Sequence, residues 1–224
     1  MADQGAATAL TAGEAAYARI RSDIVFGRIA PGQKLRLERM RSVYGVGVGT
    51  LREILSRLSA EALVLAEGQR GFEVPPVTEA ELRELAALRL LLERHALAQS
   101  FARGDVEWEG RVVAAHHKLE VVEQRMIAGA RDEAPAWKRY DGEFHQALIS
   151  ASGSRALMAA HANAFDRYLR YLMVAFCFRG AAAAAEHRAL RDAALDRDAA
   201  AAAEVLERHI AGCVDFALAS GAIA

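Results

Sequence analysis

The sequence predicts a mainly α protein made of two parts, and three observations support this prediction. Apolar residues recur at helical spacing in three segments of the first 60 residues, and a short stretch typical of a β-hairpin follows them. Beyond residue 77 the periodicity is helical throughout and alanine dominates, which favours helices packed on helices. Pro75 and Pro76 stiffen the chain between the two patterns, so a domain boundary is expected near residue 77.

Composition says less about partners. The 224-residue chain has a net charge of −1, with 10 Lys and Arg against 8 Asp and Glu up to residue 77 and 18 against 21 beyond it. The slightly positive first part and negative second part have the signs expected of a nucleic-acid-binding part and a regulatory part, but the difference in charge is small. The distant Cys177 and Cys213 indicate buried thiols in a reducing compartment. No signal peptide or membrane span is predicted, so a cytoplasmic location without membrane association is expected.

The chain is expected to begin with a disordered tail. Residues 1–13 are small and polar, which is typical of an unstructured terminus. A helix is predicted from about residue 14 to 26, because Ile20 and Ile24 lie on one face and Gly27 suits a helix end. After a turn at residues 30–32, a second helix is predicted over residues 35–44.

A glycine-rich turn at residues 45–49 introduces a third helix, around which the first part is organised. One apolar stripe on this helix is formed by Leu51, Ile54, Leu55 and Leu58. A helix of this kind can dock its apolar side on a core while Thr50, Arg52 and Arg57 face phosphates and base edges. Taken alone, the stretch fits a surface helix with solvated charges equally well.

Two short strands are predicted at residues 63–67 and 71–74, with Gly68 and Gly71 able to adopt positive φ in the turn between them. Three helices followed by a hairpin make a winged helix-turn-helix. In this fold the third helix enters the major groove and the hairpin tip contacts the backbone or minor groove. The setting therefore predicts a DNA-binding domain over residues 14–77.

The remaining residues, 78–224, are predicted to form an all-α antiparallel helical bundle. Thr78 with Glu81 three positions later is typical of a capping box at the start of its first helix. The predicted helices cover residues 78–102, 107–127, 133–150, 155–178, 181–195 and 199–219.

One acidic residue and three histidines form a candidate metal site in this bundle. Asp141 and His145 are four apart on one helix, so they project from the same face. His187 and His209 are 22 residues apart, which fits antiparallel neighbours joined near residue 197. This set could bind Zn, Ni, Mn or Co and leave one or two positions for water or an anion. Because seven histidines place some near an acid by chance, spacing alone does not favour the site.

Other polar residues of the bundle have less specific interpretations. His95, His116, His117 and His161 are interpreted as solvated or structural. Arg89 and Glu93 are four apart in an apolar helix. This pair fits either a surface salt bridge or an interior arginine that needs a carboxylate partner or ligand.

Several segments together resemble the GntR family of bacterial transcription regulators and its FadR/FCD branch. The N-terminal part does so at residues 29–35, 44–46, 51–58 and 70–74. The matching residues of the bundle are Leu88, Arg89, Glu93, Asp141, His145, Glu186, His187 and His209. The motifs follow in order over about residues 14–219, and residues 45–49 and 104–109 further resemble the carbon-starvation-induced regulators of this family.

The resemblance implies a homodimer that binds a pseudo-palindromic operator on double-stranded DNA. It implies that residues 78–224 bind an effector and dimerise, and that a divalent transition metal is held by Asp141, His145, His187 and His209. Arg89 becomes a candidate for binding the effector's carboxylate, since a bidentate guanidinium suits that task. The carbon-starvation-induced regulators imply a short dicarboxylate such as glutarate.

The sequence departs from the family at the turn before the third helix. Many members carry Ser-Arg-Thr-Pro where this chain has Gly-Val-Gly-Thr at residues 47–50, and Val48 cannot donate the hydrogen bonds of an arginine. The expected DNA contacts are therefore Thr50, Arg52, Arg57, Gln69, Arg70 and Gly71.

Together these observations predict a metabolite-responsive transcription repressor and not an enzyme. Two alternatives stay open at the level of sequence. A metal-dependent hydrolase could use the Asp and His residues to activate water, although no general base is evident beside them. An architectural DNA-binding dimer would need no effector.

Overall fold

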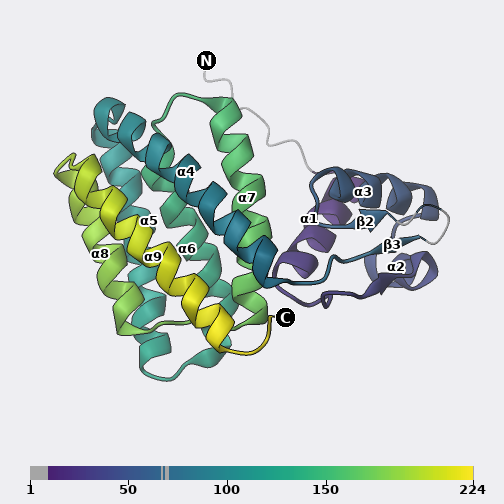
Figure 1. Cartoon of the computed structure of the whole chain (residues 1–224). Helices are drawn as coiled ribbons and strands as arrows, with labels where there is room; N and C mark the ends of the chain where they lie inside the picture. The colour runs from purple at the N-terminus through teal and green to yellow at the C-terminus, as the bar shows by residue number, and fades with distance from the viewer. Residues whose placement is uncertain (1–9, 67, 69–70, 224) are drawn as a thin grey trace, which may run out of the picture. The chain divides into compact units, whose positions relative to one another are not determined.

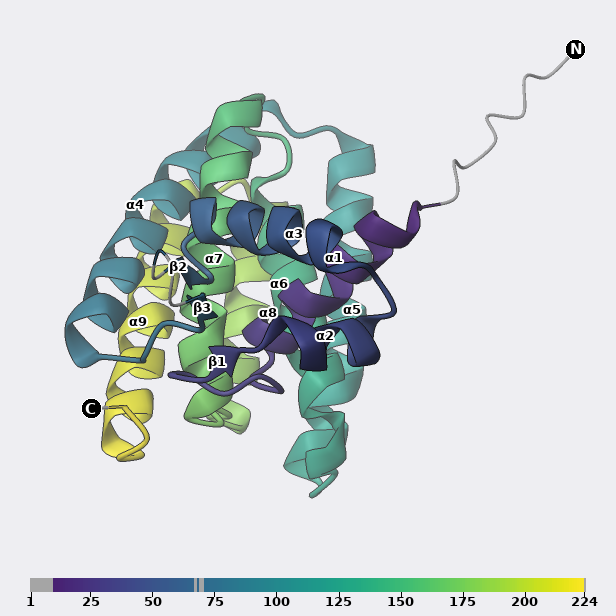
Figure 2. The ribbon, with the colours of Figure 1, turned by 90° about the vertical axis from the view of Figure 1, so that its right-hand side faces the viewer.

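The computed structural model of the protein describes residues 10–66, 68 and 71–223, and its chain divides into two compact units between Pro76 and Val77 (Figure 1). The fold is mainly α, as the sequence predicts. The N-terminal unit, shown in Figure 2, contains α1 (Ala12–Val25), β1 (Lys34–Leu35), α2 (Leu37–Tyr44), α3 (Val48–Ala60), β2 (Leu65–Ala66) and β3 (Phe72–Glu73).

Helix α1 begins earlier than the sequence interpretation placed it. The Thr11 hydroxyl accepts from the Glu14 backbone N–H at 3.2 Å, and the Glu14 carboxylate accepts from the Thr11 backbone N–H at 2.8 Å. This capping box satisfies donors that would otherwise be unpaired at the helix start. The predicted tail over residues 1–13 is therefore wrong at residues 12–13, while residues 1–9 lie outside the described part.

The predicted hairpin is part of a three-stranded antiparallel sheet with the order β1-β3-β2. Lys34 pairs with Glu73 and Leu35 with Phe72, so the second helix was predicted two residues too long at its start. Leu35 is buried as a strand residue rather than as part of α2. Its partner lies 37 positions away along the sequence, which local periodicity cannot detect.

The apolar stripe of α3 is confirmed. Leu51, Ile54, Leu55 and Leu58 are all buried. Gly45 ends α2 with φ at 69°, a left-handed conformation that favours glycine, and Gly47 stands at the N-cap of α3. The tight turn between α2 and α3 therefore depends on Gly45 in particular.

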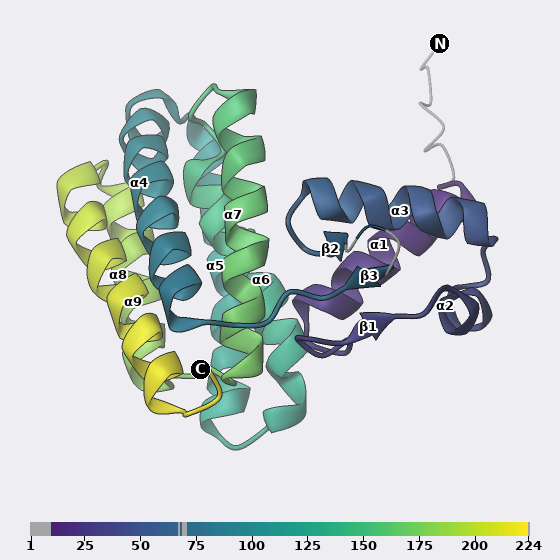
Figure 3. The ribbon, with the colours of Figure 1, turned by 45° about the vertical axis from the view of Figure 1, so that its right-hand side comes forward.

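The C-terminal unit is the predicted helical bundle. Its elements are α4 (Glu79–Arg103), α5 (Val106–Ile127), the 3-10 helix η2 (Arg131–Glu133), α6 (Ala134–Ile149), α7 (Arg155–Val174), α8 (Ala181–Leu195) and α9 (Ala199–Ala219). Helix α4 packs against α6, α7 and α9, α5 packs against α6 and α8, and α8 lies beside α9 (Figure 3). None of the described helices combines the length and apolar character needed to cross a membrane.

Two features of the bundle differ from the prediction. Helix α7 ends at Val174 rather than near residue 178, because Phe176 adopts φ of 46° and the Cys177 N–H bonds back to the Leu172 carbonyl. On α4, Leu88 continues the helical spacing of apolar residues, which predicts an inner position, but it is 42% exposed. Charged side chains take the inner positions of this turn of the helix, and they belong to the candidate site.

Candidate metal centre

Four side chains from three helices meet inside the bundle. Asp141 and His145 come from α6, His187 from α8 and His209 from α9, and each is at most 2% exposed. One ligand atom of each residue lies within 4.8 Å of those of the others. The structure thus brings together the four residues that sequence spacing and family resemblance select.

Three glutamates orient the three imidazole rings. The contacts from Nδ1 to a carboxylate oxygen are His145–Glu93 at 3.1 Å, His187–Glu123 at 2.7 Å and His209–Glu186 at 2.8 Å. An imidazole that donates through Nδ1 keeps its lone pair on Nε2, and this carboxylate–histidine arrangement is how proteins aim histidines at a metal. All three rings are therefore set to present Nε2 to a common point.

Three of the four ligand residues have a ligand atom without a hydrogen-bond partner. Nε2 of His145, Nε2 of His187 and Oδ1 of Asp141 are buried and accept or donate no hydrogen bond. His187 Nε2 lies 3.3 Å from Asp141 Oδ1, but without hydrogen-bond geometry. Leaving a buried polar atom unpaired costs about 1–3 kcal/mol. Two imidazole nitrogens and a carboxylate oxygen unpaired at one place fit the donor set of a divalent transition metal.

Charges around the cluster shift the pKa values of its members. Burial would raise the pKa of Asp141, but Lys138, whose Nζ lies 3.3 Å from Oδ2, holds it well below its usual value. Burial and the charge of Arg89 lower the pKa of His145 to about 4. Burial would lower the pKa of His187, but its contacts with Asp141 and Glu123 raise it to about 9. Without a cation, the two nearby carboxylates therefore favour the protonated form of His187.

Arg89 lies in the interior, so the surface salt-bridge interpretation is wrong. It is 1% exposed, and its Nε donates to Glu93 Oε1 at 2.7 Å. Its guanidinium lies over the rings of Phe165 and Tyr168, with centroids at 4.7 and 5.0 Å. Glu93 thus joins Arg89 to the ring of His145.

Sequence reasoning left His161 open as solvated or structural and missed Lys138 and Glu123. His161 is fully buried and contacts Glu93 Oε1 through Nε2 at 2.6 Å, so it is structural. Lys138 could have been noticed, because it lies three positions before Asp141 on the same helix. Glu123 had no local signal, since its partner His187 lies 64 positions further along the chain.

The predicted DNA-contacting residues occupy different environments within the N-terminal unit. Arg52 is exposed on α3, whereas Thr50 is half-buried. Arg57 lies 3.8 Å over the Tyr17 ring and 3.5 Å from a carboxylate oxygen of Glu61. Gly71 has φ of 100°, as a turn glycine should. The predicted contacts Gln69 and Arg70 lie outside the described residues.

Comparison with known families identifies the combination of these two units. A model described as bacterial regulatory proteins of the gntR family matches residues 12–74, and the FCD domain model matches residues 84–212. The chain belongs to the GntR family of transcription regulators. The second match shows that this GntR protein carries an FCD domain, as the resemblance implied, and members of the family are regulators rather than enzymes.

Relatives of this GntR protein agree with the assignment. It is 43% identical to the HTH-type transcriptional regulator BphR of Paraburkholderia xenovorans LB400, over 88% of this chain and 81% of BphR. It is 32% identical to the HTH-type transcriptional repressor GlaR of Escherichia coli K12, over 87% of this chain and 90% of GlaR. The structure of E. coli McbR/YncC has the same fold, with a TM-score of 0.77, 18% identity and coverage of 94% of this chain and 99% of McbR.

Substitution of a ligand should remove metal binding. We expect His187→Ala to lose stoichiometric Zn, Ni or Mn, because one of four donors and its orienting contact with Glu123 disappear together. Glu123→Gln should keep the ligands and lower metal affinity by about 10- to 100-fold. Metal analysis after equilibrium dialysis measures both effects, with His117→Ala, which removes an exposed histidine, as the control. Full occupancy in His187→Ala would place the metal elsewhere.

Metal binding should release a proton near neutral pH. The pKa of His187 is about 9 in the metal-free fold, above its usual 6.5, so the charged form stabilises this fold below pH 6.5 and the contribution is lost as pH rises through 9. A metal must displace this proton, so we expect about one proton released per ion at pH 7.5. Titration calorimetry in buffers of different ionisation enthalpy measures the number. No release at that pH would mean that His187 is already neutral.

Proposed function

We propose that this GntR-family protein is a metal-loaded, homodimeric transcription repressor whose operator affinity is controlled by a small carboxylate. A short dicarboxylate such as glutarate is our first candidate effector. The observation that supports this proposal is the group of buried, unpaired ligand atoms on Asp141, His145 and His187. We place the protein in the cytoplasm, where a bacterial regulator meets its operator.

Asp141, His145, His187 and His209 would hold the ion, with Zn, Ni and Mn as candidates suited to an imidazole-rich set. When bound, the ion would supply an open coordination position for a carboxylate oxygen. The protein's own groups orient the rings through Glu93, Glu123 and Glu186 and keep the ligand atoms out of bulk water.

The charges of the site favour an anionic effector. The site contains three buried carboxylates and two buried cations. The carboxylates belong to Asp141, Glu93 and Glu123, and the cations are Arg89 and Lys138. With neutral histidines this set has a net charge of −1, which a divalent ion converts to +1. One carboxylate group restores neutrality, and an uncompensated buried charge is costly, so this count selects an anionic ligand without distinguishing a mono- from a dicarboxylate. A neutral metabolite of the same shape would leave the positive charge in place.

Arg89 is the proposed second anchor for the effector. Glu93 engages its Nε and, at 3.5 Å, one terminal nitrogen. A guanidinium carries five N–H donors, so the contacts with Glu93 leave donors for a second carboxylate. A metal position and an arginine in one interior suit a ligand with acidic groups at both ends.

Control of DNA binding follows from dimer geometry. Two copies related by a twofold axis present two α3 helices, which must match half-sites about 34–36 Å apart. The effector must bind one arrangement of the two DNA-binding domains more tightly than the other. A ligand with equal affinity for both arrangements would not shift the equilibrium between them. The name of GlaR describes that relative as a repressor, which favours repression here.

In each DNA-binding domain we assign the DNA contacts to α3 and to the wing, which is the segment between β2 and β3. The proposed residues are Thr50, Arg52, Arg57, Gln69, Arg70 and Gly71. Arg52 is the exposed cation of α3 best suited to reach DNA, whereas the stacking of Arg57 on Tyr17 suits a positioning contact with phosphate. Val48 offers no hydrogen bond at the start of α3, so DNA shape contributes more to recognition.

A dicarboxylate should release the metal-loaded protein from its operator. The experiment uses fluorescence anisotropy with the intergenic DNA upstream of the gene, with and without glutarate. We expect glutarate to weaken binding by about 5- to 150-fold, the usual range of allosteric coupling. The uncharged diamide of glutarate and the metal-free protein should show no such change. An equal response without metal would refute the proposed site.

Arg52→Ala should weaken operator binding without unfolding the domain. Loss of one phosphate contact would lower the salt slope of log K by about 0.9, and loss of a base contact would cost about 1–3 kcal/mol. Arg83→Ala removes an exposed arginine from α4 and should leave DNA affinity unchanged. Anisotropy titrations at several salt concentrations separate the outcomes, and a native affinity for Arg52→Ala would exclude its role.

A further inference from the structure

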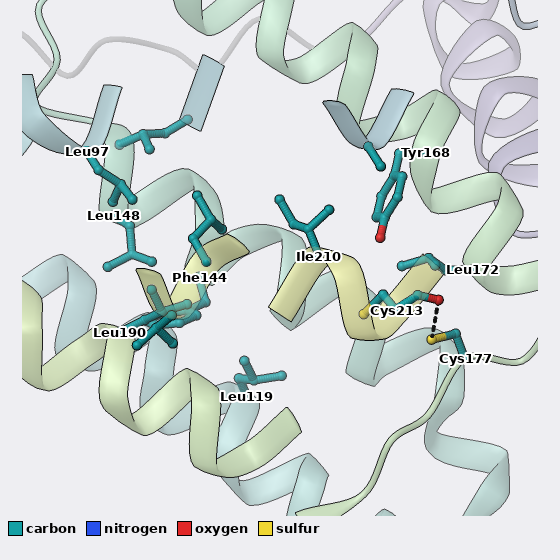
Figure 4. Close-up of a cluster of buried hydrophobic side chains, with 14 of the residues drawn as sticks. Leu97, Leu119, Phe144, Leu148, Tyr168, Leu172, Cys177, Leu190, Ile210 and Cys213 are labelled. Atoms are coloured by element: carbon teal, nitrogen blue, oxygen red, sulfur yellow. Dashed lines mark hydrogen bonds between the residues drawn. The ribbon is translucent and has the colours of Figure 1, made fainter. Parts of the chain in front are cut away.

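Two buried thiols lie together beside the candidate metal centre. Cys177 is in the segment between α7 and α8, Cys213 is on α9, and they are 1% and 3% exposed. Both are free thiols. The Cys177 thiol donates to the backbone carbonyl of Cys213, with sulfur and oxygen 3.7 Å apart (Figure 4).

The two thiols have different electrostatic surroundings. The Cys177 side chain, together with the nearby His209, Lys138 and Arg179, lowers the pKa of Cys213 despite its burial. The contact with Cys213 and burial raise the pKa of Cys177. Cys213 is therefore the thiol of the pair that loses its proton more readily.

Both cysteines adjoin the group that orients His209. Arg179 lies two residues after Cys177, and its Nη1 donates to Glu186 Oε1 at 3.2 Å. Its Nη2 lies 3.2 Å from both the carbonyl oxygen and Nδ1 of His209. Arg179 therefore fixes Glu186 and His209 from the segment that carries Cys177.

The Arg179 guanidinium lies directly against the backbone of α9. Gly212 immediately precedes Cys213, and a Cβ at Gly212 would lie 2.6 Å from Nη1 of Arg179. The guanidinium in its present position thus occupies the space beside this glycine. A movement of Cys213 relative to Cys177 must displace this contact.

We propose that Cys177 and Cys213 form a modification site, in which a peroxide converts the thiol pair into an intramolecular disulfide that weakens metal binding through His209. The disulfide itself depends on the two thiols alone, whereas its effect on the metal rests on the proposed function. One thiolate attacks the peroxide oxygen, the O–O bond breaks and a sulfenic acid forms with release of one water. The second thiol attacks that sulfur, the S–S bond forms and a second water leaves. Hydrogen peroxide is reduced to two waters, which take up both thiol protons.

Bridge formation must move the two segments. A disulfide requires sulfurs about 2.05 Å apart, so side-chain rotation and a shift of the segment against α9 must accompany it. Arg179 belongs to the segment that carries Cys177, so this shift would disturb its present contacts with Glu186 and His209. Loss of such an orienting contact lowers metal affinity by about 10- to 100-fold.

The test uses the full-length, metal-loaded protein treated with hydrogen peroxide and then desalted. We expect denatured thiol titration to fall from two thiols to none, the intact mass to fall by two hydrogens, and peptide mapping to find the Cys177–Cys213 cross-link. Affinity for the ion, measured by competition with a chromogenic chelator, should fall at least about tenfold. Dithiothreitol should restore both thiols and the affinity.

Single substitutions provide the matched controls. Cys177→Ser and Cys213→Ser each retain one thiol, so peroxide should leave their metal affinity unchanged. Persistence of both thiols, a disulfide between two chains, or added oxygen without a cross-link would overturn the modification site. An intramolecular disulfide with unchanged metal affinity would overturn its effect on the centre. If the reduced protein binds no metal, the proposed function fails, while the thiol count still decides the disulfide.

Discussion

The C-terminal domain depends on one buried carboxylate. Glu93 on α4 accepts from Arg89 on its own helix and contacts His145 on α6 and His161 on α7. Burial would raise the pKa of Glu93, but Arg89 and His145 hold it well below its usual range, so the group is charged in the interior. Three helices therefore have fixed relative positions because they share the partners of one charge.

This arrangement is poorly explained by stability alone. Replacing a buried ion pair with apolar residues of similar volume is often neutral or stabilising, because charges lose their hydration. Here the interior also leaves ligand atoms of Asp141, His145 and His187 without hydrogen bonds, which adds further cost. A bound divalent cation would reduce both costs, since it would satisfy the unpaired atoms and more than offset the single excess negative charge. The bundle core around the site, with residues such as Phe144 and Leu190, supplies the apolar packing that holds this polar centre in place (Figure 4).

The candidate metal centre and the cysteine pair depend on the same kind of contact between neighbouring segments. Each ligand histidine is held by a glutamate from another helix, as His187 is by Glu123, and Arg179 extends this support to the segment between α7 and α8. Small changes in that segment are therefore transmitted to His209 by direct contacts rather than over a distance. In the N-terminal unit, Gly45 adopts a left-handed conformation at the end of α2 and so directs the chain into α3.

Local sequence determined much of this protein. Helical period, glycine turns and caps identified nearly every helix, the buried stripe of α3 and the shared face of Asp141 and His145, because these signals act within one or two turns of chain. Tertiary structure decided what depends on distant partners. It placed β1 beside β3, Glu123 beside His187 and the two cysteines beside each other, although 36 or more positions separate the partners of each pair. It also turned Arg89 inward and Leu88 outward, since the phase of a packed helix, and not the hydrophobicity of single residues, determines which side chains are buried.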